Sequence, residues 1–328
     1  LLLILVTSLF NRCTDHVDYE AIEGYQITSE IYFQQEADYD AALVGTYDVL
    51  QWLFFNIQLG AIASEITLCG GESATDYIGI QQIDDMTHYP ENNVLRQIWQ
   101  FLYEGVNRAN YMEENKANID FEGKEAMYGE VYFLRAYYYF ELVNFLGDVP
   151  LFTEARLTAG QAGTLTRTPK DEVYAQIELD LQNAIASLPN SQSQVGRVNK
   201  YTAYALLGKV LLYQDKFAEA ASALDNVIGV YSLVSDYGSQ FLRFGENGPE
   251  SVFEIQYSNQ SNWYDWGCVH CSEGNYAIIM NGPRGWSGPE YAQGWSFNVP
   301  TEEFYNSVVE GDSRRDATVL DIEAFAAA

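Results

Sequence analysis

Basic residues are scarce in this sequence. Its 328 residues hold 17 Lys and Arg against 46 Asp and Glu, which gives a formal net charge of −29. Binding to a nucleic-acid backbone or to an anionic lipid surface requires clustered basic residues. The composition therefore argues strongly against nucleic acid as a partner and against electrostatic docking on a membrane. The acidity by itself favours solubility.

Recognisable catalytic motifs are also lacking. The chain has three histidines, His16, His88 and His270, and contains no G-x-S-x-G, H-E-x-x-H or phosphate-loop sequence. Carboxylates are abundant, so composition leaves glycosidase chemistry open. The acidic pairs 84–85 and 302–303 are interpreted as solvated surface. We therefore predict a protein that is not an enzyme and needs no cofactor.

Cysteine is rare, with four residues in the whole chain. Cys268-Val269-His270-Cys271 is a single C-x-x-C, whereas a structural zinc site needs four ligands and no second pair exists. Outside the cytosol a local disulfide is the favoured reading, with zinc as the weaker alternative. We predict no metal site, and Cys69 is left over.

Aromatic and apolar residues are plentiful, with 25 Tyr, 17 Phe and 6 Trp. The segment from Lys124 to Leu151 predicts a long helix buried on several sides, since apolar residues cover more than one stripe of it. Gly147 is expected to end this helix in a left-handed cap, and Pro150 prevents its continuation. Arg135 falls on the apolar side, so we expect a carboxylate or carbonyl partner from another element.

Helical periodicity recurs along the chain up to residue 229. Helices are predicted over 37–53, 92–114 and 168–189, the last with Thr168 as its N-cap, whereas 64–90 is interpreted mainly as loop. Residues 201–229 fit the tetratricopeptide helix-turn-helix repeat, in which Gly208 and Ala220 allow two helices to approach closely. The helices at 124–147 and 168–189 fit a neighbouring, irregular repeat.

The pattern changes after residue 241. Residues 249–257 alternate as a short strand does, and residues 300–309 predict a helix. Between them lies a glycine-rich, irregular stretch with an unusual density of Trp and Tyr. Flat aromatic rings stack on sugar rings, and neighbouring amides and acids bind hydroxyls, so this stretch is a candidate binding surface. The alternative is that the aromatic residues fasten the loop to the helices.

The segment Lys124–Leu151 also resembles the most recognisable part of the SusD/RagB family, through the pattern G-E-x-Y-F-L-R-A followed by G-D-V-P-L. The family's E-S-[IV]-F-E-[IV] and P-T-x-E-F…G-D-x-R-R-D segments are matched at 250–255 and 300–316. The resemblance implies a mostly α-helical, SusD-like fold: a tetratricopeptide-type scaffold with a loop-rich C-terminal part carrying short strands. It also implies that a C-terminal portion is absent from this sequence.

The function implied by the resemblance is glycan binding at the cell surface. Such a protein captures oligosaccharide or polysaccharide and delivers it to a SusC-type TonB-dependent transporter in the outer membrane. The alternative is a tetratricopeptide scaffold that binds protein or peptide. The expected glycan contacts come from the aromatic stretch and, as in the family, from a loop before the Lys124 helix: Trp263, Tyr264, Trp266, Trp286, Asp76 and Tyr77.

The first ten residues are an apolar run that is too short to span a bilayer and resembles the core of a signal peptide. The resemblance implies lipid attachment at Cys13, although Arg12 departs from the usual lipoprotein signal. A buried or disulfide-bonded Cys13 is the alternative. The expected organisation is a signal-peptide remnant (1–12), a tether (13–36), the helical scaffold (37–240) and the loop-rich part (241–328).

Overall fold

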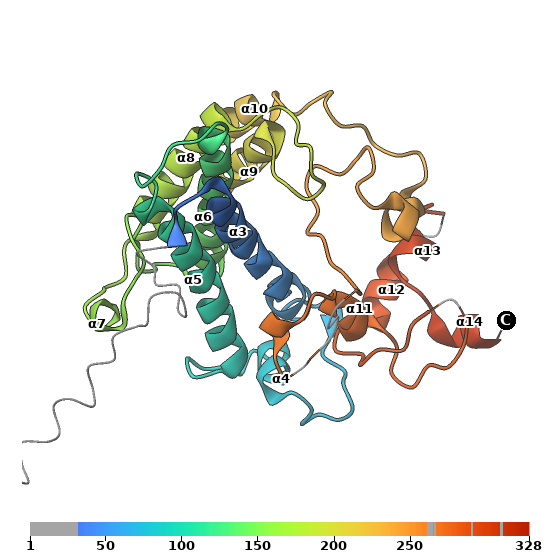
Figure 1. The fold of residues 1–328 in the computed structure, drawn as a ribbon. Helices are drawn as coiled ribbons and strands as arrows, with labels where there is room; N and C mark the ends of the chain where they lie inside the picture. The colour runs from blue at the N-terminus through green and yellow to red at the C-terminus, as the bar shows by residue number, and fades with distance from the viewer. Residues whose placement is uncertain (1–31, 261–264, 266, 290, 309–310, 328) are drawn as a thin grey trace, which may run out of the picture.

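A computed structural model describes residues 32–260, 265, 267–289, 291–308 and 311–327. The predicted signal remnant, Cys13 and most of the tether lie outside these residues. Figure 1 shows a bundle of long helices on one side and, beside it, a loop-rich part with short helices. This arrangement confirms the predicted fold class. No helix among the described residues is both long and apolar enough to cross a bilayer.

Helix α6 (Lys124–Leu146) is the centre of the bundle, between α5 (Asn93–Glu114) and α8 (Lys170–Ser187). Its burial on several sides is as predicted, because Tyr128, Tyr138, Tyr139 and Phe140 are all fully buried. Gly147 follows the helix with φ of 70° and ψ of −131°, so the expected positive φ is present but the left-handed helical ψ is not.

Arg135 has the partner that its burial requires. Its Nε and Nη2 donate to the two carboxylate oxygens of Asp180 on α8, at 2.8 and 2.7 Å. Its Nη1 donates to the side-chain oxygen of Asn110 on α5 at 3.0 Å and to the Thr153 carbonyl at 2.6 Å. The guanidinium therefore joins three elements of the bundle and is a structural ion pair.

The predicted helix at 37–53 is two elements: α3 (Glu36–Asp48) continues into a 3₁₀ turn, η1 (Val49–Trp52). Helix α5 begins as expected, with the Asn92 side chain accepting from the backbone N–H groups of Val94 and Leu95. The prediction of Thr168 as the N-cap of α8 is wrong. Pro169 holds that position, and the Asp148 carboxylate accepts from the Lys170 N–H at 2.8 Å instead.

The tetratricopeptide-like pair consists of α9 (Lys200–Leu212) and α10 (Phe217–Leu224), which pack side by side. Gly208 is needed at this contact, because a Cβ there would lie 2.5 Å from Cγ of Leu224. Ala220 is buried, as the repeat pattern predicts. Small residues on one helix thus admit large ones from the other.

The segment 64–90 is mainly loop, as predicted, but it also contains a strand, β1 (Thr67–Leu68), and a helix, α4 (Ile78–Asp84). The prediction of a strand is wrong for the segment 249–257. Its carbonyls at Val252 and Gln256 accept from side chains, those of Thr202 and Gln51, rather than from a neighbouring strand.

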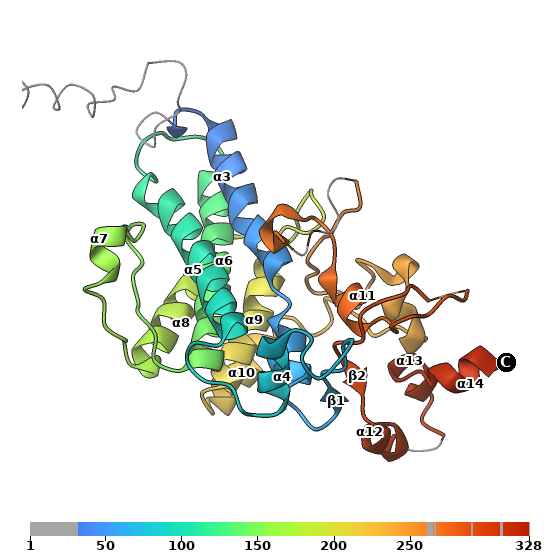
Figure 2. The same ribbon diagram turned by 90° about the horizontal axis from the view of Figure 1, so that it is seen from below.

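Strand β1 pairs antiparallel with β2 (Val299–Pro300), with Thr67 opposite Pro300. Figure 2 shows this pair where the helical bundle meets the loop-rich part. The predicted helix near 300 is α12 (Glu302–Ser307), capped by Thr301. The other short helical elements are η2 (Asn56–Ala61), α7 (Ala159–Ala162), η3 (Tyr237–Phe241), η4 (Arg243–Gly245), η5 (Val269–Cys271), α11 (Tyr276–Asn281), α13 (Arg315–Thr318) and α14 (Ile322–Ala327).

Candidate functional site

Two loops that are far apart in sequence meet beside the β1–β2 pair. The Gly71 N–H donates to the Ser296 carbonyl at 2.8 Å. Gly71 has φ of 79°, and a Cβ there would lie 2.9 Å from the Phe297 ring, so glycine is needed at this approach. The structure thereby places the 70–77 loop, expected as a second source of contacts, against the 282–297 loop of the aromatic stretch.

Asp76 and Arg284 join these loops. The Arg284 Nη2 lies 3.2 Å from Oδ2 of Asp76, and the same carboxylate oxygen accepts from the Glu72 N–H at 2.9 Å. Both side chains remain about one-third exposed, at 31% and 33%. The pair offers a carboxylate and a guanidinium to solvent. Sequence analysis missed Arg284, although no other Lys or Arg occurs between residues 258 and 295 of the sequence.

Tyr77 is mainly a packing residue here. It precedes α4 with φ of 49°, and its ring meets Phe297 edge to face, with centroids 5.9 Å apart. Burial raises the pKa of Tyr77 to about 12. Tyr77 thus lies beside Asp76 in the candidate site, and its contact with glycan stays a prediction.

Trp286 belongs to a small aromatic cluster that is partly exposed to solvent. Its ring centroid lies 5.7 Å from that of Phe325, and Tyr291 lies 5.0 Å from Phe325 on an edge-to-face geometry. Tyr291 is 42% exposed, and Trp286 and Phe325 are half-buried. We call Trp286, Tyr291 and Phe325 the aromatic ledge. Phe325 lies in a late segment that sequence analysis did not connect with the aromatic stretch.

Trp263, Tyr264 and Trp266 lie outside the described residues, and their role stays a prediction. Asp265, between them in sequence, is described. Its backbone N–H donates to the Tyr276 hydroxyl at 3.0 Å, and that hydroxyl donates to its carbonyl at 2.6 Å. Tyr276 is buried and stacks on Phe54 with centroids 5.5 Å apart, which anchors Asp265 to the helical scaffold.

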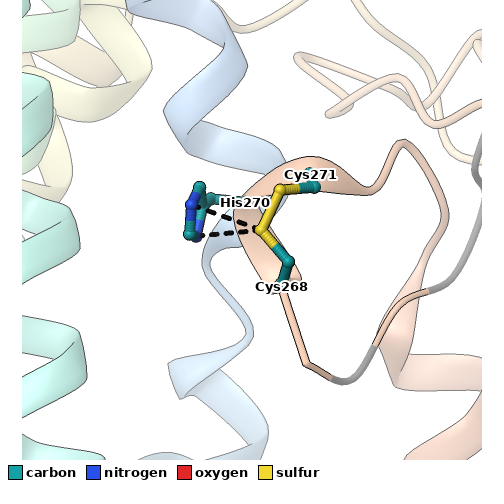
Figure 3. Close-up of side chains that lie close together, drawn as sticks. All are labelled: Cys268, His270 and Cys271. Carbon is teal, nitrogen blue, oxygen red and sulfur yellow. Dashed lines mark hydrogen bonds between the residues drawn. A yellow bond between two sulfur atoms is a disulfide. The ribbon is translucent and has the colours of Figure 1, made fainter.

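Cys268 and Cys271 form the predicted local disulfide, shown with His270 in Figure 3. The ligand atoms of Cys268, His270 and Cys271 lie within 4.8 Å of one another, but both sulfur atoms are used by the disulfide. The His270 ring meets Trp52 of η1 edge to face at 5.6 Å. Cys69 is free and buried, and burial raises the pKa of its thiol to about 12.

A concave region lies on the helical bundle and was not foreseen. This groove of about 560 Å³ lies between α3, the 194–197 turn and the 253–256 segment. Arg197 lines this groove and forms an ion pair with Asp40, with Nη2 2.7 Å from the Asp40 carboxylate. The Tyr47 hydroxyl donates to Glu130 at 2.6 Å, and burial beside that carboxyl raises the pKa of Tyr47. Its charged groups are thus largely paired within the protein.

Packed helix pairs beside a loop-rich part with partly exposed aromatic side chains define the class of this molecule as a mostly α-helical scaffold. A family model described as starch-binding and associating with the outer membrane matches residues 63–212. SusD-like protein P2 of Formosa agariphila is 30% identical over 313 residues, which cover 91% of this chain and 60% of that protein. The chain thus spans about 60% of the length of such curated relatives.

Solved structures agree with the sequence relatives. A laminarin binding SusD-like protein is 33% identical with a TM-score of 0.83, over 90% of this chain and 68% of that chain. Surface glycan-binding protein A from Bacteroides thetaiotaomicron, in complex with laminarihexaose, is 25% identical with a TM-score of 0.79, over 88% and 64% of the two chains. The chain belongs to the SusD-like family, which confirms the resemblance seen in the Lys124–Leu151 segment.

Proposed function

We propose that this protein binds a neutral oligosaccharide or polysaccharide at the surface formed by the aromatic ledge, the Asp76–Arg284 pair and Tyr77. Trp263, Tyr264 and Trp266 are proposed as further contacts. The observation that carries the proposal is the ledge itself: Trp286 and Tyr291 are partly open to solvent in a loop that Arg284 ties to Asp76.

The chemistry of this surface suits sugar. Partly exposed aromatic rings supply flat apolar area, and the carboxylate and guanidinium, each about one-third exposed, supply an acceptor and a donor for hydroxyl groups. With a net charge of −29, the protein repels polyanions at low salt, which favours an uncharged glycan. Two similar solved proteins are named for laminarin or hold laminarihexaose, so a laminarin-type glucan is the first candidate ligand.

The proposed action is capture without catalysis. Bound glycan passes to a SusC-type TonB-dependent transporter, and lipid attachment at Cys13 keeps the protein at the outer membrane. The description of the matching family model, starch-binding and associating with the outer membrane, supports this setting.

The test is calorimetric titration of the purified chain with laminarin and a panel of other neutral and acidic polysaccharides. Trp286→Ala removes the indole of the ledge, and we expect it to weaken binding by about fivefold or more, since stacked aromatic contacts contribute about 1–3 kcal/mol each. The matched control is Phe244→Ala, which removes an aromatic side chain that is 76% exposed on η4 and is not part of the ledge.

Unchanged affinity in Trp286→Ala, or equal losses in both variants, would remove the ledge from the site. Absence of binding to every polysaccharide, together with binding to a peptide, would favour the protein-binding scaffold instead. Release of reducing ends from a bound polysaccharide would show that the protein is an enzyme.

A further inference from the structure

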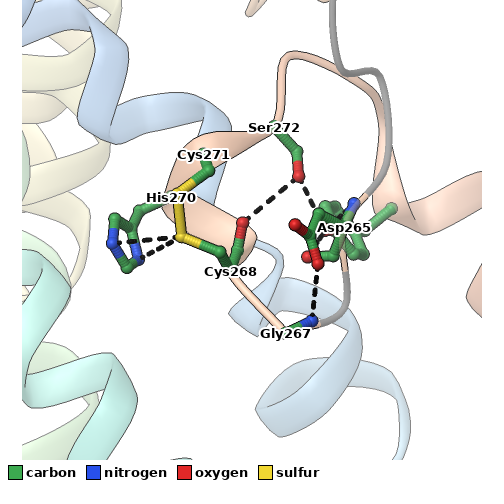
Figure 4. The surroundings of a disulfide bond; sticks show 7 residues. Asp265, Gly267, Cys268, His270, Cys271 and Ser272 are labelled. Atoms are coloured by element: carbon green, nitrogen blue, oxygen red, sulfur yellow. Dashed lines mark hydrogen bonds between the residues drawn. A yellow bond between two sulfur atoms is a disulfide. The ribbon is translucent and has the colours of Figure 1, made fainter.

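The Cys268–Cys271 disulfide lies in an accessible turn that the proposed glycan function does not use. Cys271 and His270 are exposed and Cys268 is half-buried, while Val269 between them is buried. Figure 4 shows the disulfide together with the polar groups that surround the turn. Cys271 is therefore the more exposed of the two cysteines, and Cys268 is the one more covered by the protein.

The His270 imidazole lies next to one sulfur atom of the disulfide, that of Cys268. Its Nε2 lies 3.3 Å and its Nδ1 3.8 Å from Sγ of Cys268 (Figure 3). Edge-to-face contacts with Trp52 at 5.6 Å and Phe101 at 6.3 Å hold the ring there. A protonated imidazole at this distance stabilises a thiolate, so the site favours Cys268 as a leaving group.

Hydrogen bonds hold the turn in addition to the disulfide. The Cys271 N–H donates to the Cys268 carbonyl at 2.9 Å, and the Ser272 N–H donates to the Val269 carbonyl at 3.1 Å. The Ser272 hydroxyl lies 3.3 Å from the Cys268 carbonyl and 3.0 Å from the buried Tyr276 hydroxyl. A bridge between residues three apart also closes a very short loop, which restricts the unfolded chain least.

From the exposed position of Cys271 and the His270 imidazole beside Sγ of Cys268, we propose that this pair is a thiol–disulfide exchange site whose substrate is a low-molecular-mass thiol. The thiolate of the small molecule attacks Sγ of Cys271, forming a mixed disulfide and releasing Cys268 as a thiolate beside His270. A second small thiolate attacks the outer sulfur of the mixed disulfide and releases Cys271 as a thiolate. The small thiol is oxidised to its disulfide, and the protein pair is reduced by two electrons.

The exchange is independent of the glycan proposal, since neither cysteine nor His270 belongs to the aromatic ledge or to the Asp76–Arg284 pair. A failure of one proposal would leave the other standing.

The experiment equilibrates the full chain with defined ratios of reduced and oxidised glutathione in the presence of a metal chelator. Free thiols are then trapped with a maleimide, and the peptide that carries Cys268 and Cys271 is weighed by mass spectrometry. This separates the pair from the buried Cys69. We expect His270→Ala to move the equilibrium roughly tenfold toward the disulfide and to slow release of Cys268 by a similar factor.

Two variants make the result specific. His88→Ala removes another exposed histidine and is expected to leave both the equilibrium and the rate unchanged. His270→Lys returns a cation to the turn and is expected to recover part of the loss. Equal equilibria in wild type, His270→Ala and His88→Ala would overturn the proposal. A wild-type disulfide that stays oxidised in millimolar reduced glutathione would also overturn the proposal, since the bond would then be purely structural.

Discussion

Two tyrosine hydroxyls on α6 donate to backbone carbonyls in the last turns of neighbouring helices. The Tyr138 hydroxyl donates to the Thr46 carbonyl at 2.6 Å, in the last turn of α3. The Tyr128 hydroxyl donates to the Met112 carbonyl at 2.6 Å, in the last turn of α5. Carbonyls in the last turn of a helix lack the usual partner four residues on, and that of Met112 also accepts from the Asn115 N–H at 3.1 Å. A phenylalanine at either position would fill the same space and leave such a carbonyl without this donor.

Glu141 is a residue whose burial has a measurable consequence. It lies on α6 and is 6% exposed. Burial raises the pKa of Glu141 to about 7, while Lys209 and a hydrogen bond with Tyr137 act in the opposite direction. In the unfolded chain the reference pKa is 4.5. The unfolded state thus loses this proton first, so stability falls as pH rises from about 4.5 to about 7.

We expect Glu141→Gln to remove this pH dependence. Below pH 4.5 the variant should unfold at nearly the same urea concentration as wild type, because the carboxyl is protonated in both states. Above pH 7 it should be more stable, by a free energy of unfolding on the order of 3 kcal/mol. Urea unfolding followed by circular dichroism at pH 4 to 8 checks this. A constant difference at all pH values would show that the effect is not one of ionisation.

Between helices α5 and α6, a glycine allows the close contact. Gly105 on α5 faces Tyr138 on α6, and a Cβ at this position would lie 2.5 Å from the tyrosine ring. Tyr138 is fully buried and its hydroxyl is bonded to α3, so the ring has little freedom to move away. The approach of α5 to α6 therefore depends on the missing side chain.

Gly105→Ala is expected to destabilise the protein by about 1–3 kcal/mol, since overpacking outweighs the better helix propensity of alanine. The control is Gly160→Ala in α7, where nothing lies within 4 Å of the added Cβ and no loss is expected. The free energy of unfolding of both variants from urea titrations makes the comparison. Equal stability of the two would show that α5 and α6 separate without cost.

The whole molecule combines a rigid helical bundle with a strongly acidic surface. Many of its basic side chains are committed to internal ion pairs, such as Arg135 with Asp180 and Arg197 with Asp40. A ligand that approaches the protein therefore meets an excess of negative charge, in line with the net charge of −29. A neutral sugar is indifferent to this field, whereas a polyanion is repelled by it.

Affinity for a neutral glycan such as laminarin is thus expected to change less than twofold between about 0.02 and 0.5 M sodium chloride. Binding of an acidic polysaccharide, by contrast, should be weakest at the lowest salt. Calorimetry at several salt concentrations measures both. A steep loss of laminarin affinity with salt would contradict stacking and hydrogen bonding as the source of binding.

Sequence alone determined the features that depend on near neighbours. Apolar periodicity located α5, α6, α8 and the α9–α10 pair, and the C-x-x-C spacing predicted its own disulfide. The expected burial of Arg135 indicated that it needs a partner, but it did not indicate which residue that partner is. Helices and short loops close within a few residues, so a local pattern is sufficient to predict them.

Only the tertiary structure decided which distant groups meet. Asp180 reaches Arg135 from 45 residues away, and Asp76 meets Arg284 across 208 residues. Strand β1 exists because β2 pairs with it, whereas the more strand-like segment at 249–257 has no such ladder. Strand pairing and ion pairs across the fold depend on the path of the whole chain, and no short stretch of sequence records that path.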